Sequence, residues 1–303
     1  MSGVVLVSGD FSSGTTLLFT LFRHADDTHC LYEPLHERLL HFLIWPPRQY
    51  EGHSFVEDYF GEYKGFDAIP RLFDPAWGTS RLHLGADSDA PRLRRYLAYL
   101  IEMSHHRAPT AVLKENRFTF RLAWLRRHFP QARIVNVYRD RDEQWGSWVR
   151  RAQEHLGRQD VGQDSADFMA FRLAAWCDEL ADTYPELAAE RCSSGYERFS
   201  RLWQLSRDEH ERHAHVCVNL SELRSDFPLA CARISKAVGL ELDPAHLAHL
   251  VAPERGPRDA TRTSRRDRVV DRIGMRYAEA RVRLQRRYAA ADTSSRGRET
   301  AGE

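Results

Sequence analysis

The chain has 303 residues, of which 42% are hydrophobic and 29% charged, and its formal net charge at pH 7 is +1. This length suits one large α/β domain or two small ones, and the hydrophobic content excludes a disordered chain. The net charge near zero excludes a protein that binds polyanions with its whole surface. A site for an anion must therefore be local.

The five cysteines are odd in number and form no C-x-x-C pair. They support neither a disulfide framework nor a zinc site, which favours a reducing compartment. The N-terminus lacks a basic stretch followed by an apolar one, so we expect no signal peptide. The apolar run at 39–45 is too short to span a bilayer. These features predict a cytoplasmic protein.

The chain opens with a buried-strand pattern at 4–8 (VVLVS), a small polar loop at 9–14 and an apolar helix at 15–24. Residues 48–90 are rich in aromatic residues, Gly, Pro and Asp, which predicts irregular structure or an excursion that faces the substrate. Further along, apolar spacing predicts strands at 111–113, 133–138 and 216–220. It also predicts helices at 91–107, 121–128, 168–180, 198–213 and 227–238, and one more helix between the strand at 133–138 and residue 151.

Strands that alternate with helices in this way predict an α/β fold of three layers. We expect a P-loop-like arrangement with a mostly parallel central sheet and helical insertions that form the acceptor pocket. A single domain is expected to fill residues 1–290. The polar stretch at 291–303 (ADTSSRGRETAGE) predicts a disordered tail.

The segment GDFSSGTT at 9–16 fits G-x-x-x-x-G followed by two threonines, between a predicted strand and a predicted helix. Glycines let the backbone approach an anion closely, and the N–H groups of the turn and of the helix N-terminus then point at it. The P-loop lysine that bridges nucleotide phosphates is missing, which argues against NTP hydrolysis. The alternative is a glycine-rich turn without a ligand. The candidate anion-binding residues are Ser12, Ser13, Gly14, Thr15 and Thr16.

A second candidate anion site follows the predicted strand at 133–138. Arg139 comes directly after this strand, where parallel sheets bind ligands, and Ser147 lies eight residues later in the next predicted helix. A guanidinium and a hydroxyl in these positions can hold one phosphate from two sides. The alternative is a surface arginine and a small helix residue.

Four segments in order resemble the sulfotransferase family that uses 3′-phosphoadenosine 5′-phosphosulfate (PAPS). They are SGDFSSGTTLL, LKENRFTFRLAWLRRHFPQARIVNVYRD, the Arg139…Ser147 spacing and VNLSELRSDFPLACARISKAVGLELD. The resemblance implies that the first loop binds the 5′-phosphosulfate and that Arg139 and Ser147 bind the 3′-phosphate, with no metal required. In this family a late basic loop closes over the 3′-phosphate. This suggests such a role for the basic tract at 255–272, with Arg255 as the candidate, and a solvated helix face is the alternative.

The segment LYEPLHERL resembles the EPL segment of carbohydrate sulfotransferases. Glu33 stands twenty-one residues after Ser12, which is similar to the spacing of the glutamate base in tyrosylprotein sulfotransferases. We expect Glu33 to follow the helix that leaves the loop, with an extended backbone favoured by Pro34. Glu33 is the leading candidate for the base and His36 the reserve. A solvated loop glutamate is the alternative.

Lys114 falls at the end of the strand expected at 111–113. Cytosolic phenol and steroid sulfotransferases carry a lysine in a similar block, with the catalytic histidine two residues later, where this chain has Asn116. The resemblance therefore favours a carboxylate base and lets Lys114 place an ammonium on the transferring group. A solvated lysine is the alternative. Ser12 stands where the family carries Lys or Arg, so either Lys114 or an arginine supplies that charge, or catalysis is weak or lost.

The function implied is transfer of a sulfuryl group from PAPS to a hydroxyl, giving PAP. The expected acceptor is a glycan or other carbohydrate-like or polar small molecule, and neither a nucleic acid nor a membrane is expected as a partner. One alternative is a small-molecule kinase, which would need the missing loop lysine and a magnesium-binding aspartate. The other is a non-catalytic relative that binds PAP or PAPS, for which Ser12 is the best support.

Overall fold

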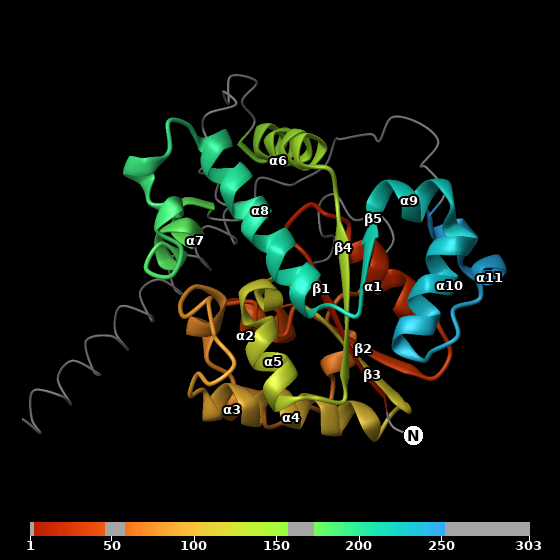
Figure 1. Ribbon diagram of the computed structural model, residues 1–303. Helices are drawn as coiled ribbons and strands as arrows, with labels where there is room; N and C mark the ends of the chain where they lie inside the picture. The colour runs from red at the N-terminus through yellow and green to blue at the C-terminus, as the bar shows by residue number, and fades with distance from the viewer. Residues whose placement is uncertain (1–2, 46–57, 157–172, 252–303) are drawn as a thin grey trace, which may run out of the picture. The chain divides into compact units, whose positions relative to one another are not determined.

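Five parallel strands form a central sheet in the order β2-β3-β1-β4-β5 (Figure 1). The central strands β1, β3 and β4 carry mainly buried apolar side chains, because helices cover both faces of the sheet. This confirms the predicted α/β fold with a parallel sheet flanked by helices. The strands are β1 (Gly3–Ser8), β2 (Thr28–Tyr32), β3 (Thr110–Lys114), β4 (Ala132–Tyr138) and β5 (Val216–Asn219).

Helices α1 and α10 pack on one face of the sheet with α11 against them, and α4 and α8 pack on the other face with α5 against α8 (Figure 1). The helices are α1 (Thr15–Arg23), α2 (Leu39–Ile44), α3 (Ile69–Leu72), α4 (Pro91–His105), α5 (Leu122–His128), α6 (Arg141–Leu156), α7 (Leu173–Leu180), α8 (Gly195–His213), α9 (Leu220–Ser225), α10 (Phe227–Val238) and α11 (Pro244–Val251).

This computed structural model describes residues 3–45, 58–156 and 173–251. The described residues belong to one compact unit, Met1–Pro253. The expected domain limit at 290, the tail at 291–303 and the basic tract at 255–272 lie outside them, so those expectations stay predictions.

The predicted strands and helices are found within a few residues of their expected ends, where they fall in the described segments. The sequence analysis missed β2, because the polar Thr28 and His29 interrupt its short apolar run. It also missed α2, α9 and α11. Residues 58–90 contain only short helical turns, as expected for an irregular excursion.

A second hydrophobic cluster lies apart from the main core and involves α6, α7 and α8. Trp145 and Trp148 on α6 are 5% and 3% exposed and belong to this cluster with Phe199. Phe11 from the loop after β1 joins them. The cluster therefore ties the loop at 9–14 to the helices beyond β4.

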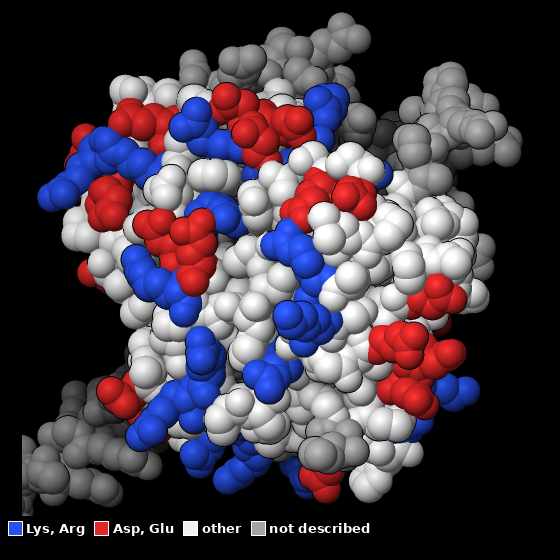
Figure 2. Space-filling view, turned by 45° about the vertical axis from the view of Figure 1, so that its right-hand side comes forward, with Lys and Arg blue, Asp and Glu red and all other residues white. Residues whose placement is uncertain are grey.

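Acidic and basic side chains lie side by side over the upper part of one face, and a run of basic side chains crosses its middle (Figure 2).

All five cysteines carry free thiols. In the described segments, no helix has both the length and the apolar character needed to cross a membrane.

Gly9 is the position in the loop after β1 where a larger residue is least tolerable. A Cβ there would lie 2.5 Å from the carbonyl oxygen of Val137 and 2.8 Å from Cγ2 of Thr15. We predict that Gly9→Ala lowers the free energy of unfolding by about 1–3 kcal/mol, because the backbone must move to relieve the overlap. Urea denaturation measures this change.

The matched control is Gly85→Ala, since a Cβ at Gly85 meets no atom closer than 3.9 Å. Its free energy of unfolding should stay within about 0.5 kcal/mol of the wild type. Equal effects of the two substitutions would contradict the close packing of the loop on β4.

Candidate active site

The parallel register of β1, β2 and β3 brings three loops together at one edge of the sheet. Val7 of β1 and Tyr32 of β2 both pair with Lys114 of β3. The N–H of Glu33 donates to the Lys114 carbonyl at 2.7 Å, and the N–H of Glu115 donates to the Val7 carbonyl at 2.9 Å. The loop after β1, the turn at Glu33 and the segment that begins at Glu115 therefore all leave the sheet at the carboxyl ends of these strands.

The loop between β1 and α1 has a backbone that can wrap an anion. Ser12 and Gly14 have φ angles of 65° and 106°, in the left-handed region. The N–H and the Oγ of Ser13 both donate to the carbonyl of Asp10, at 3.2 Å and 2.7 Å, which closes the turn. No side chain caps α1, so the N–H groups of its first turn face the loop.

The hydroxyl groups of the loop lie toward β2 and β3. Thr15 Oγ1 donates to Asn116 Oδ1 at 3.4 Å, and Thr16 Oγ1 lies 3.2 Å from the Tyr32 hydroxyl. Ser12 Oγ is buried and has no hydrogen-bond partner among the described residues. A buried polar atom without a partner is costly, which fits a hydroxyl that a ligand satisfies.

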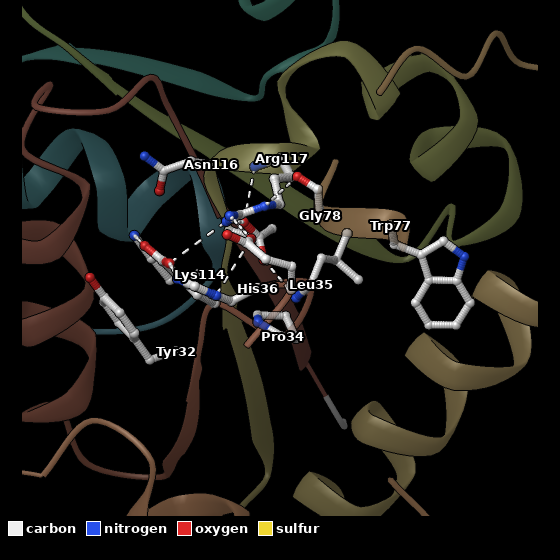
Figure 3. A network of polar contacts seen from close by, with 12 residues as sticks. Tyr32, Pro34, Leu35, His36, Trp77, Gly78, Lys114, Asn116 and Arg117 are labelled. Atoms are coloured by element: carbon white, nitrogen blue, oxygen red, sulfur yellow. Dashed lines mark hydrogen bonds and ion pairs between the residues drawn. The ribbon is translucent and has the colours of Figure 1, made fainter. Parts of the chain in front are cut away.

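Glu33 and Lys114 form a buried ion pair, with Lys114 Nζ 2.6 Å from Glu33 Oε1 (Figure 3). The Lys114 ammonium also lies 4.3 Å from the centre of the Tyr32 ring. Burial acts to raise the pKa of Glu33, but Lys114, His36 and Arg117 outweigh it and lower that pKa below its ordinary value. Burial lowers the pKa of Lys114 despite its partner. Glu33 is therefore an ionised, tightly held carboxylate.

The backbone at Glu33 differs from the expectation. Glu33 follows the strand β2 rather than the helix α1, and its φ is 44°, so the backbone is left-handed and not extended. A residue with a side chain before proline rarely takes this conformation, and the surrounding contacts must hold it. The N–H of His36, which donates to the Glu33 carbonyl at 3.0 Å, closes a turn that supplies one such contact.

Arg117 joins the carboxylates around Glu33, and the sequence analysis missed it. Its guanidinium lies 2.6 Å from Glu37 Oε2, 3.2 Å from Glu115 Oε1 and 3.7 Å from Glu33 Oε2, and its Nε donates to the Gly78 carbonyl. Burial acts against the charge, but these three carboxylates raise the pKa of Arg117. The signal in the sequence was the run K-E-N-R, which begins at the last residue of β3 and places three charged side chains at the end of this strand.

His36 lies beside the same carboxylates. Its Nδ1 accepts a hydrogen bond from the N–H of Arg38 at 3.0 Å, and its Nε2 is 3.9 Å from Glu33 Oε2. Burial lowers the pKa of His36. Burial therefore favours the neutral imidazole, and because Nδ1 accepts from Arg38, the proton of that neutral form lies on Nε2, toward Glu33.

Arg139 and Ser147 lie where the sequence predicts them, after β4 and within α6. The Arg139 side chain is 18% exposed, and its Nε donates to Glu143 Oε2 at 3.1 Å. Ser147 is half-buried. No hydrogen bond joins the two within the part of the chain that is described, so their shared phosphate site stays a prediction. Arg255 lies outside the described residues.

We predict that Arg117→Met destabilises the fold by about 3–5 kcal/mol, because the buried carboxylates of Glu33 and Glu115 and the half-buried one of Glu37 lose their shared cation. Arg92→Met is the control, since the Arg92 side chain is 68% exposed and lies 3.5 Å from Asp74. The control should change the free energy of unfolding by less than about 1 kcal/mol. If urea denaturation gives equal losses for both, the carboxylate cluster does not depend on Arg117.

Comparisons with known proteins bear on this site. A profile of the sulfotransferase family matches residues 5–244. Two bacterial structures are similar. Sulfotransferase STF9 from Mycobacterium avium has a TM-score of 0.45 at 16% identity, over 82% of this chain and 67% of that one.

Sulfotransferase STF1 from Mycobacterium tuberculosis has a TM-score of 0.37 at 18% identity, over 83% and 71%. No curated protein matches the chain. In the described ranges, no group of three or more His, Cys, Asp or Glu side chains is arranged to hold a metal ion. The family match spans the loop after β1, the Glu33–Lys114 pair and the loop after β4, and the chain belongs to the sulfotransferase family.

Proposed function

We propose that the chain transfers a sulfuryl group from PAPS to a hydroxyl of a carbohydrate-like or other polar small molecule, and releases PAP. The observation that carries this proposal is the anion loop beside the buried Glu33–Lys114 pair. Thr16 of the loop and Lys114 both contact Tyr32, so a donor on the loop lies near a carboxylate and an ammonium.

The donor would be held at two places. The 5′-phosphosulfate would lie on the loop. There the N–H groups of the first turn of α1 are not capped by a side chain, and the Ser12 hydroxyl has no hydrogen-bond partner among the described residues. The 3′-phosphate would lie at the end of β4, between Arg139 and Ser147. The loop has no lysine, and β4 runs into Tyr138 and Arg139 rather than into an aspartate that could hold magnesium. These residues favour PAPS over ATP as the ligand.

The reaction is an in-line displacement at sulfur. The acceptor hydroxyl must lose a proton as its oxygen bonds to sulfur, and negative charge develops on the oxygen that joins sulfur to the nucleotide. Glu33 is ionised and can accept that proton, although its low pKa makes it a weak base. Lys114 can leave Glu33 as the proton arrives and stabilise the leaving oxygen. In this scheme Lys114 supplies the charge that Ser12 lacks.

An acceptor that reaches Glu33 would meet a polar cluster. Glu37, His36 and Arg117 lie next to the Glu33 carboxylate. Hydrogen-bonding groups of this kind suit an acceptor that carries several hydroxyls. This is the support for a carbohydrate-like or similarly polar acceptor.

We predict that PAP raises the melting temperature of the full chain, because a ligand that binds only the native state stabilises it by about 2.7 kcal/mol at 100 times its Kd. ATP with magnesium should do much less. Arg139→Ala should weaken PAP binding by about 2–4 kcal/mol, since a phosphate loses a charge-assisted contact.

The control is Arg133→Ala, an exposed arginine near the other end of β4. It should leave the Kd for PAP unchanged. Equal stabilisation by ATP–magnesium and PAP would contradict the choice of donor, and normal PAP binding by Arg139→Ala would misplace the 3′-phosphate.

We predict that Glu33→Gln lowers turnover by roughly 10²–10⁴ while PAP binding stays nearly intact, because it removes the base and not a phosphate contact. Lys114→Met should lose donor affinity modestly and turnover more strongly, since its charge counts most in the transition state. Turnover with labelled PAPS and PAP titrations separate the two effects. If Glu33→Gln keeps full turnover and His36→Ala abolishes it, His36 is the base instead.

A further inference from the structure

A half-buried carboxylic acid belongs to the loop to which we assign the donor. Asp10 is the second residue of this loop, and its carbonyl closes the turn by accepting the N–H and Oγ of Ser13. Its carboxylate accepts a hydrogen bond from Ser206 Oγ of α8 at 2.7 Å. A loop that binds an anion therefore carries an acid of its own, a few bonds from the N–H groups that would hold the ligand.

Among the described residues, the charged side chain that acts on Asp10 comes from α8. Arg207 is the cation, but its guanidinium lies 2.7 Å from Glu211, 3.4 Å from Asn136 Oδ1 and 3.5 Å from the centre of the Tyr138 ring. It is thus shared among other partners. No ion pair joins Asp10 to a base in the described part of the chain.

His210 is a second titratable group of α8, and it contacts the Ser206 that donates to Asp10. Its Nδ1 lies 2.7 Å from the Ser206 carbonyl, and its Nε2 lies 2.9 Å from Ser8 Oγ. Burial lowers the pKa of His210 to about 4, so it is neutral at pH 7 and gives Asp10 no countercharge. From α6, the neutral Gln144 donates to the Phe11 carbonyl.

Aromatic side chains complete the surroundings of Asp10. Asp10 helps to line a small hollow whose other walls include Phe120, Trp148, Trp176 and Trp203. Burial raises the pKa of Asp10 to about 7, against the smaller effects of the Ser206 hydrogen bond and the Arg207 charge. Both the acid and the carboxylate are therefore populated near neutral pH.

We propose that Asp10 is a proton-linked positioning residue of the donor site, which takes up a proton when the anionic donor binds to its loop. The proposal rests on the assignment of PAPS as donor. An anion and a carboxylate in one loop repel each other, and more strongly where water is excluded. The bound donor therefore favours the protonated acid, and by linkage the protonated acid favours the donor.

The consequence is that donor affinity falls as pH rises through neutrality. Below pH 7 most Asp10 is already protonated, so donor binding requires no further free energy to protonate it. Above pH 7 each tenfold drop in proton concentration weakens binding by up to about tenfold, until the carboxylate form binds on its own. The test compares the wild type with Asp10→Asn, which keeps the acceptor oxygen for Ser206 but cannot titrate.

The measurement is the Kd for PAP of the full chain from pH 6 to pH 8.5, by calorimetry in two buffers of different protonation enthalpy. The phosphates of PAP titrate near pH 6 in both proteins, so the ratio of the two Kd values cancels their effect. We expect similar Kd values at pH 6 and a Kd up to about tenfold lower for Asp10→Asn at pH 8. Calorimetry should show additional proton uptake on binding only in the wild type.

Ser206→Ala is the second variant and guards against a purely structural effect. The Ser206 hydroxyl lowers the pKa of Asp10, so its loss should move the midpoint of the pH profile upward. A residue that only holds the loop would change Kd by the same factor at every pH. Parallel pH profiles for the wild type and Asp10→Asn overturn the role of Asp10 while PAP remains the ligand. Failure of all three proteins to bind PAP at any pH overturns the proposed donor as well.

Discussion

The site depends on the parallel register of β1, β2 and β3. Because Val7 and Tyr32 both pair with Lys114, the residues that follow these strands begin at one edge of the sheet. The loop after β1, the turn at Glu33 and the acid Glu115 then meet without any further constraint. A shift of one residue in β2 would move Glu33 to the other side of the sheet edge and leave the Lys114 ammonium buried without its carboxylate.

Nearly all the charged side chains at this edge form ion pairs with one another. Lys114 and Arg117 face Glu33, Glu37 and Glu115, so neither cation is free to bind a nucleotide in this arrangement. In the proposed function, the loop after β1 would therefore bind the donor through backbone N–H groups and hydroxyls, which agrees with Ser12 in place of a basic residue. The bound donor would have to loosen the Glu33–Lys114 pair before the ammonium could stabilise the leaving oxygen of that donor. In the proposed mechanism, this would couple donor binding to the position of Glu33, the candidate base.

The sequence predicted the parts of the fold that are marked by long apolar runs or by glycine. The strand at β1, the helix α1 and the loop between them follow from local pattern, and so does the position of Arg139 after β4. The edge strand β2 could not be predicted in this way, because an edge strand needs less apolar character than a central one. The left-handed Glu33 and the role of Arg117 arise from contacts between segments about eighty residues apart, and no local pattern records those.

The central claim is that this member of the sulfotransferase family moves a sulfuryl group from PAPS to a hydroxyl. The most direct measurement incubates the protein with PAPS and an extract of small metabolites and follows the products by mass spectrometry. The account predicts at least one hydroxyl compound that becomes heavier by one sulfuryl group, together with an equal amount of PAP, and predicts no such product with Glu33→Gln on the same timescale. PAP that binds tightly while no metabolite gains a sulfuryl group would contradict the claim.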